Sequence, residues 1–140
     1  MKIKIIEMRK PGTKEERVFM KVMQKCNLWD FIVYDETFDD EGEPSNLMPH
    51  MHRMPAVQAK EGMFVSLRTQ GDPAKSHLGT LNDDETPCYY EYWGLERTIF
   101  NQEGDTVHLV EIADETSKTY ESEDWADYFW EYIELREELQ

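Results

Sequence analysis

The stretch between Tyr92 and Ile112 constrains the fold more than any other part of this chain. Residues 92–100 are rich in aromatic and β-branched side chains, residues 101–105 are polar and include one glycine, and residues 106–112 resume the pattern of a strand. This pattern is typical of two strands joined by a tight turn, because glycine and asparagine tolerate the positive φ that such a turn needs. The sequence therefore predicts a β-hairpin here.

Short runs with strand character recur along the rest of the chain, at residues 2–6, 18–23, 31–34 and 63–69. In the first run, Ile3 and Ile5 are expected to face the core, and in the second run Val18, Met20 and Val22 share one side. Helical spacing also fits residues 18–23, so a helix remains an alternative there. Residues 35–45 and 70–86 are rich in acidic and turn-forming residues and are expected to form polar loops.

The last twenty residues have a different character. Ser122 can cap the N-terminus of a helix, and Trp125, Phe129, Tyr132 and Ile133 recur at spacings of three and four. We therefore expect a mainly β protein, in which residues 1–120 form an immunoglobulin-like antiparallel β-sandwich and residues 121–140 form an appended acidic, aromatic α-helix. The aromatic stripe of this helix is a candidate partner surface, which could cover the sandwich, join two copies in a homodimer or bind another protein.

Charge and length limit the classes of function. A chain of 140 residues can build a core of its own, and 39% hydrophobic with 12% aromatic residues is too rich for a disordered protein. Thirty acidic against 15 basic residues give a formal net charge of −15, which repels phosphate backbones and anionic membrane surfaces. We therefore expect no nucleic-acid ligand, no membrane partner and, without an apolar run of about 18 residues, no membrane span.

The two cysteines and the first residues indicate the compartment. Neither Cys26 nor Cys88 belongs to a Cys-x-x-Cys pair, and a core of this size needs no covalent staple, so two buried free thiols are expected. The apolar alternation at the N-terminus is too short for the core of a signal peptide. Both features favour a cytoplasmic protein.

One segment resembles a known family. The aromatic residues ending in Phe100, followed by Asn101, the Gly104-Asp105 turn and the strand through Leu109, resemble the signature of the lamin tail domain, as does Trp93 upstream. That family is an immunoglobulin-like β-sandwich found in nuclear lamins and, in bacteria, as an accessory module beside enzymes. The resemblance covers about residues 2–112. It implies an interaction module with no catalytic residues of its own.

Residues that could carry chemistry are few. In an extended segment Met48, His50, His52 and Met54 would point to one side, and thioethers with imidazoles suit copper or, less well, zinc. Flanking prolines and the lack of a third His or Cys nearby favour an exposed edge or loop over a metal site. No pattern of a nucleophile beside a base, and no glycine-rich phosphate loop, is present. We therefore expect neither an enzyme nor a cofactor.

The sequence thus favours a non-catalytic protein-interaction or structural module that binds a protein partner. One alternative is an acidic inhibitor or immunity-type protein that masks a basic enzyme, because residues 121–140 hold eight acidic residues against a single arginine. A second alternative is weak metal binding through residues 48–54.

Overall fold

The computed structural model describes residues 1–36, 50–81 and 85–120. The expected helix over residues 121–140, with Trp125, Phe129, Tyr132 and Ile133, lies outside these ranges, and so does Met48. Within the described ranges the protein is mainly β. Its strands are β1 (Ile3–Arg9), β2 (Arg17–Val22), β3 (Cys26–Asn27), β4 (Phe31–Glu36), β5 (Met51–Arg53), β6 (Gln58–Ala59), β7 (Phe64–Arg68), β8 (His77–Thr80), β9 (Pro87–Tyr92) and β10 (Thr106–Glu111), with short 3-10 turns at η1 (Leu28–Asp30) and η2 (Pro73–Lys75).

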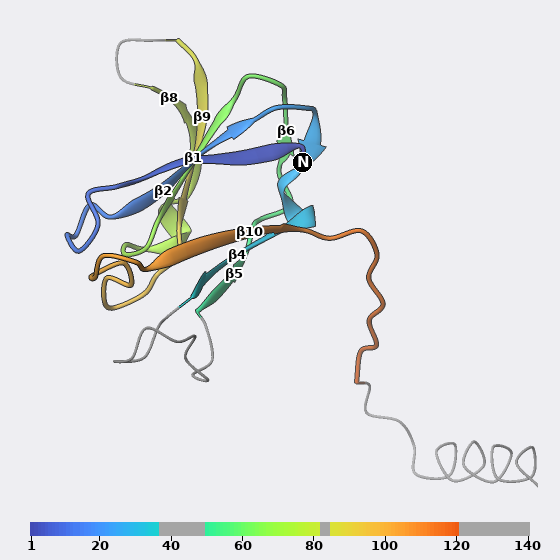
Figure 1. Ribbon diagram of the computed structural model, residues 1–140. Coiled ribbons are helices and arrows are strands. Elements are labelled where there is room, and N and C mark those ends of the chain that lie inside the picture. Colours follow the sequence, from blue (N-terminus) through green and yellow to red (C-terminus); the bar gives the residue numbers. More distant parts are fainter. Residues whose placement is uncertain (37–49, 82–84, 121–140) are drawn as a thin grey trace, which may run out of the picture.

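The strands form two main sheets and one small one. The five-stranded sheet has the order β1-β2-β7-β9-β8, the three-stranded sheet has the order β10-β4-β5, and β3 pairs with β6. Figure 1 shows β10, β4 and β5 below the larger sheet. Neighbouring strands are antiparallel except β7 and β9, which are parallel. The expectation of a wholly antiparallel architecture is therefore wrong at this pair, because the chain passes through η2 and β8 before β9 enters beside β7.

The core lies between the two main sheets. Val18, Met20 and Leu67 come from the larger sheet, whereas Phe31 and Val33 come from the smaller one, and all five belong to one buried cluster. Ile3 is buried and Ile5 packs against the same cluster, as the alternation in residues 2–6 predicts. Residues 17–22 form a strand, which decides against the helical alternative. Burying each large aliphatic side chain contributes about 1.5–3 kcal/mol relative to leaving it exposed.

The hairpin predicted between Tyr92 and Ile112 is wrong. β9 ends at Tyr92 in the five-stranded sheet, whereas β10 begins at Thr106 in the three-stranded sheet and pairs with β4. Residues 93–105 therefore cross from one sheet to the other. The apolar side chains expected in a strand instead fill the core from this connection, since Ile99 and Phe100 are buried there and Trp93 packs against the cluster.

Two segments expected to be polar loops contain strands. The sequence predicts a solvated loop that begins at Asp35, yet Asp35 belongs to β4 and is 1% exposed. Residues 77–80 form β8, an edge strand whose partner is β9. Short polar strands at an edge lack the alternation that reveals a half-buried strand, which explains why β8 was missed.

Both cysteines are free and buried, as expected. Burial raises the pKa of the Cys26 thiol and of the Cys88 thiol, which favours the protonated form of each. In the described part of the chain, no helix has the length and apolar character required to cross a membrane.

Candidate functional site

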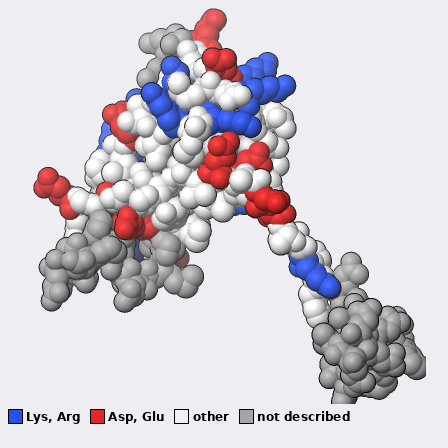
Figure 2. Space-filling view, turned by 45° about the vertical axis from the view of Figure 1, so that its right-hand side comes forward, with Lys and Arg blue, Asp and Glu red and all other residues white. Residues whose placement is uncertain are grey.

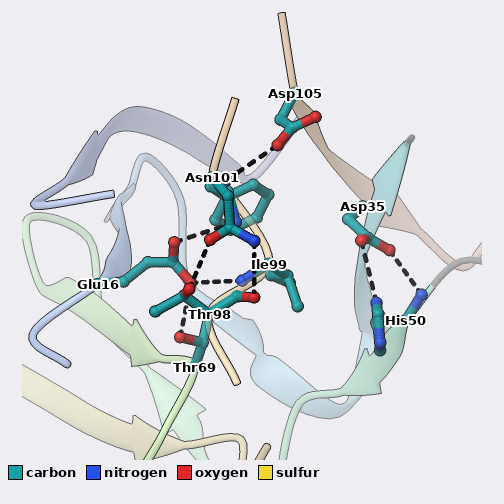
Figure 3. Close-up of polar contacts among 9 residues, drawn as sticks. Glu16, Asp35, His50, Thr69, Thr98, Ile99, Asn101 and Asp105 are labelled. Carbon is teal, nitrogen blue, oxygen red and sulfur yellow. Dashed lines mark hydrogen bonds and ion pairs between the residues drawn. The ribbon is translucent and has the colours of Figure 1, made fainter. Parts of the chain in front are cut away.

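The connection between the two sheets is anchored on the carboxylate of Glu16, which is 0% exposed. Its Oε1 accepts the backbone N–H groups of Gly12 (2.9 Å) and Phe100 (3.0 Å). Its Oε2 accepts the N–H of Ile99 (2.9 Å) and the hydroxyl of Thr69 (2.8 Å), as Figure 3 shows for several of these contacts. Four donors satisfy a buried charge that would otherwise be costly, so the role of Glu16 is structural.

Residues 101–105 form the turn that precedes β10, as the sequence predicts. Gly104 has a φ of +99°, a conformation that residues with a Cβ rarely adopt. The carboxylate of Asp105 accepts the backbone N–H groups of Asn101 and Gln102, each at 3.0 Å. Leu109 packs against the core from β10. Asn101, Gly104 and Asp105 therefore form and anchor a turn at the surface. Their roles in this turn explain why these residue types occur here, with no need for a bound ligand.

A cavity of about 580 Å³ lies beside this turn. Asp35, His50, Thr98, Asn101 and Asp105 contribute polar groups to its wall. Asp35 accepts the backbone N–H of His50, whose ring Nδ1 also lies 3.0 Å from the carboxylate, and the Thr98 hydroxyl bonds the Asn101 side chain (Figure 3). Each of these side chains is already engaged by a neighbour in the chain.

In the described part of residues 48–54, the segment considered for metal binding, the side chains do not point to a common site. The ring of His50 lies against Asp35, His52 packs on Trp93 with ring centroids 5.5 Å apart, and Met54 is 1% exposed in the core. The described residues contain no group of three or more His, Cys, Asp or Glu side chains that could hold a metal ion. In the described part of this segment, His50, His52 and Met54 therefore have different neighbours and do not converge on one point.

His52 and Glu91 face each other from the two sheets. The Nε2 of His52 lies 3.9 Å from the Oε1 of Glu91, and Oε1 also accepts the hydroxyl of Ser76 at 2.9 Å. Burial lowers the pKa of His52 and raises the pKa of Glu91, so burial favours the neutral form of each group. The Nε2 of His52 and the Oε2 of Glu91 are buried without a hydrogen-bond partner. Ionisation of either group therefore alters a contact between the sheets.

The outer face of the five-stranded sheet combines cations with aromatic rings. Val18, Met20, Val65 and Leu67 point to the core, so the alternate residues of β2 and β7 point outward. The strand registers place residues of β1 and β9 on the same side. We call this surface the cationic face and define it by Lys4, Arg9, Arg17, Phe19, Lys21, Phe64, Ser66, Arg68, Tyr90 and Tyr92.

Ring contacts order the cations of this face. The guanidinium of Arg9 lies 3.7 Å from the centroid of the Phe19 ring, and the Lys21 amine lies 5.7 Å from that of Phe64. The two rings stack on each other with centroids 5.1 Å apart. Each cation–π contact at an exposed site contributes about 0.5–1 kcal/mol. The positive groups are therefore held at the surface in defined positions, and Phe19 beneath them is only 4% exposed.

Like charges stand directly opposite one another across the strands. Arg9 pairs in register with Arg17, Arg17 pairs with Arg68, and Lys4 pairs with Lys21. Such pairs destabilise a sheet, because opposed side chains are only about 4.5–5.5 Å apart at Cβ. The neighbouring carboxylates are Glu7, paired with Arg9, and Glu15, which contacts Arg17 at 2.9 Å and Arg68 at 3.6 Å. The five lysine and arginine side chains of these pairs thus have two carboxylate partners, and the face keeps a net positive charge.

A groove of about 230 Å³ opens on this face. Arg9, Lys10 and Arg17 bring three cations to its wall, beside Ser66 and Tyr90. Ser66 is 2% exposed, and its hydroxyl has no hydrogen-bond partner in the described structure. A buried free hydroxyl among cations suits an anionic oxygen, which accepts strong hydrogen bonds from all of these groups.

The acidity of the chain is unevenly distributed. Residues 37–49, 82–84 and 121–140 contain 14 of the 30 acidic residues but only one of the 15 basic ones, Arg136. The described residues therefore hold 16 acidic and 14 basic residues, which is close to neutral. In Figure 2, Lys and Arg side chains lie in the upper part of the molecule, with Asp and Glu side chains among them. Most of the net charge of −15 thus comes from residues 37–49, 82–84 and 121–140, and the cations of the cationic face belong to a body that is close to neutral.

Sequence reasoning missed both Glu16 and the cationic face. A signal for the face exists in residues 17–22, because assigning Val18, Met20 and Val22 to the core leaves Arg17, Phe19 and Lys21 on the opposite side. No comparable signal marks Glu16, whose donors come from distant parts of the chain. Comparison with known proteins yields no match to a protein-family model, a curated protein or a solved structure.

Proposed function

We propose that this protein is a non-catalytic protein-interaction module that binds an acidic protein segment on its cationic face. The observation that carries the proposal is the row of Arg9, Arg17 and Arg68 on three adjacent strands. Repulsion between these opposed guanidinium groups lowers the stability of the sheet. An anionic partner that binds between them relieves this repulsion. The free hydroxyl of Ser66 in the adjacent groove adds a donor for a carboxylate.

The chemistry of the face favours carboxylates over nucleic acid. Proteins that bind single strands stack bases on exposed aromatic rings. Here Phe19 is 4% exposed beneath Arg9, and Phe64 lies between Phe19 and Lys21, so cations and a neighbouring ring cover these platforms. The net charge of the whole chain also opposes an extended phosphate backbone. The same net charge repels an acidic protein segment as well, so the covered rings are what favours carboxylates over nucleic acid on this face.

As the scaffold of this module we propose an immunoglobulin-like β-sandwich of the lamin tail type. Two sheets with a shared core support it, together with the turn in which Asn101, Gly104 and Asp105 have the roles expected of the family signature. In such modules binding surfaces lie on the outside of the sheets and in the loops, while the interior is packed. The cationic face is a surface of this kind.

The test is a binding measurement with a defined acidic probe. A fluorescein-labelled peptide of alternating glutamate and tyrosine is titrated with the full chain, and fluorescence anisotropy reports the bound fraction. The double variant Arg17→Gln, Arg68→Gln removes two cations from the face, and Lys60→Gln, Arg97→Gln removes the same charge elsewhere. We expect the first variant to weaken binding about tenfold or more, equivalent to about 1.4 kcal/mol, and the second to change it little.

Two results would overturn this function. Equal losses in both double variants would show that only net charge matters. Tighter binding of labelled oligothymidylate than of the acidic peptide, lost in the Arg17→Gln, Arg68→Gln variant, would assign the face to nucleic acid.

A further inference from the structure

We infer that the groove on the cationic face binds the phosphoryl group of a phosphorylated side chain in the acidic partner. This inference rests on the function proposed above and names the chemical group that the partner brings to the groove. The groove combines three cations with a buried hydroxyl that has no hydrogen-bond partner in the described structure. Both features suit one ligand, an oxyanion with several acceptor oxygens.

A small side chain between two large ones creates the hollow. Ser66 of β7 pairs in register with Phe19 of β2 on one side and with Tyr90 of β9 on the other. The Tyr90 hydroxyl donates to the carbonyl of Thr80 at 2.7 Å, which holds that ring at the groove wall. The groove of about 230 Å³ is several times larger than the volume of about 30 Å³ that a water molecule takes in the liquid, so a phosphoryl group fits.

The hydroxyl of Ser66 is the observation that points to a ligand. The residue is buried, and its oxygen lacks a hydrogen-bond partner among the described residues. A buried polar group without a partner is costly, so native proteins satisfy nearly all such groups. The Arg9 side chain at the groove wall is 45% exposed, and its rotation lets an oxygen of the ligand reach the hydroxyl. The guanidinium group of Arg9 then closes on the same ligand.

Three cations reach the groove from one end of the β1–β2 hairpin. Arg9 ends β1, Lys10 follows it in the turn, and Arg17 begins β2. Arg9 and Arg17 each contact a surface carboxylate, but surface ion pairs contribute little and do not block an incoming anion. The Lys10 amine has no ion-pair partner among the described residues. Lys10 also has a φ of +48°, where glycine is less strained, so the turn alone does not account for a lysine.

The donors favour a phosphoryl group over a carboxylate. A carboxylate accepts hydrogen bonds through two oxygens that lie in one plane. A phosphoryl group has three acceptor oxygens and a charge of about −1.5 to −2 at pH 7, and it engages arginine forks and a lysine amine together. Three cations and one hydroxyl around a small volume match the second group. Leu81 and the ring of Tyr90 give the wall an apolar part, against which the ring of a phosphotyrosine can pack.

Two variants probe the groove with little risk to the fold. Ser66→Ala removes only an oxygen without a partner, so it should not lower the midpoint of urea unfolding. Lys10→Gln removes the groove cation that has no ion-pair partner among the described residues. Lys60→Gln is the matched control, because Lys60 lies in the turn before β7 and does not line the groove.

The test is fluorescence anisotropy of the full chain with three labelled peptides. The first is the glutamate–tyrosine peptide of the binding test above, and the second carries phosphotyrosine at its central tyrosine. The third replaces that tyrosine by two glutamates, which supply a similar charge. We expect the phosphorylated peptide to bind about tenfold more tightly than the third peptide. Ser66→Ala and Lys10→Gln should each reduce this preference to about threefold or less, whereas Lys60→Gln should leave it unchanged.

The results distinguish this inference from the proposed function. If the phosphorylated and charge-matched peptides bind alike, while both still depend on Arg17 and Arg68, the proposed function stands and this inference fails. A preference that survives intact in both Ser66→Ala and Lys10→Gln would overturn the groove as its site. Full displacement of the phosphorylated peptide by an equal concentration of inorganic phosphate would assign the groove to the free ion instead. If binding of the unphosphorylated peptide does not depend on Arg17 and Arg68, the proposed function itself fails.

Discussion

Replacing Glu16 by glutamine should destabilise the protein severely, although the side chain keeps its shape. The four donors that surround the carboxylate come from Gly12, Thr69, Ile99 and Phe100. A carboxylate accepts from all of them, whereas one end of the glutamine amide is an NH2 group. In one orientation it faces the N–H groups of Gly12 and Phe100; in the other it faces the N–H of Ile99, and only the Thr69 hydroxyl can turn to accept from it, so at least two N–H groups stay unpaired. Leaving a buried donor unpaired costs about 1–3 kcal/mol, so two of them cost about 2–6 kcal/mol. A domain is stable by only about 5–15 kcal/mol, and the variant would lose a large part of that.

The assay is equilibrium unfolding in urea followed by tryptophan fluorescence. Glu15→Gln is the matched control, because Glu15 precedes Glu16 in the sequence but makes only exposed ion pairs with Arg17 and Arg68, which contribute about 0–1 kcal/mol. We expect a much lower midpoint for Glu16→Gln and a small change for Glu15→Gln. Equal midpoints for the two variants would refute the view that Glu16 anchors the connection between the sheets.

Three further predictions follow from particular residues. Burial raises the pKa of Glu91, so the stability contributed by its protonated form is present at pH values below the ordinary glutamate range and is lost as pH rises through the folded-state pKa. The free energy of unfolding of Glu91→Gln, relative to that of the unaltered protein, should therefore be higher at pH 7 than at about pH 4. An equal difference at both pH values would refute this. Gly104 has a φ of +99°, so Gly104→Ala should lower the free energy of unfolding by about 1 kcal/mol in the same urea assay, and an unchanged midpoint would speak against the turn. Cys26 and Cys88 are buried with raised pKa values, so a thiol reagent such as DTNB should modify neither in native protein and both in denaturant; rapid labelling of native protein would contradict their placement.

The local signals in the sequence predict local structure well. Alternation identified the inward side chains of β1 and β2, and the Asn101–Asp105 stretch predicted a turn with glycine at a positive φ. These features depend on neighbours within a few residues, so the pattern in the chain contains them. The prediction of two free thiols has a different basis, because it rests on the size of the core and not on a local pattern.

Local sequence patterns do not predict which distant segments pair with one another. An apolar run near Phe100 fills the core from a strand or from a connection equally well, and no local pattern shows that β9 and β10 belong to different sheets. The parallel pairing of β7 with β9 depends likewise on where the chain re-enters the sheet. The candidate site was missed for a related reason: the net charge averages over the chain, whereas Arg9, Arg17 and Arg68 become neighbours only when three strands align.

The most direct test of the cationic face is a map of where an acidic peptide binds. Backbone amide NMR signals of the full chain are followed while the unlabelled glutamate–tyrosine peptide is added. We predict that the largest shift changes occur at Arg9, Arg17, Ser66 and Arg68, on the outer side of β1, β2 and β7. Changes centred instead on the cavity beside Asp35 and His50, or on the three-stranded sheet, would contradict the claim that this face is the binding surface.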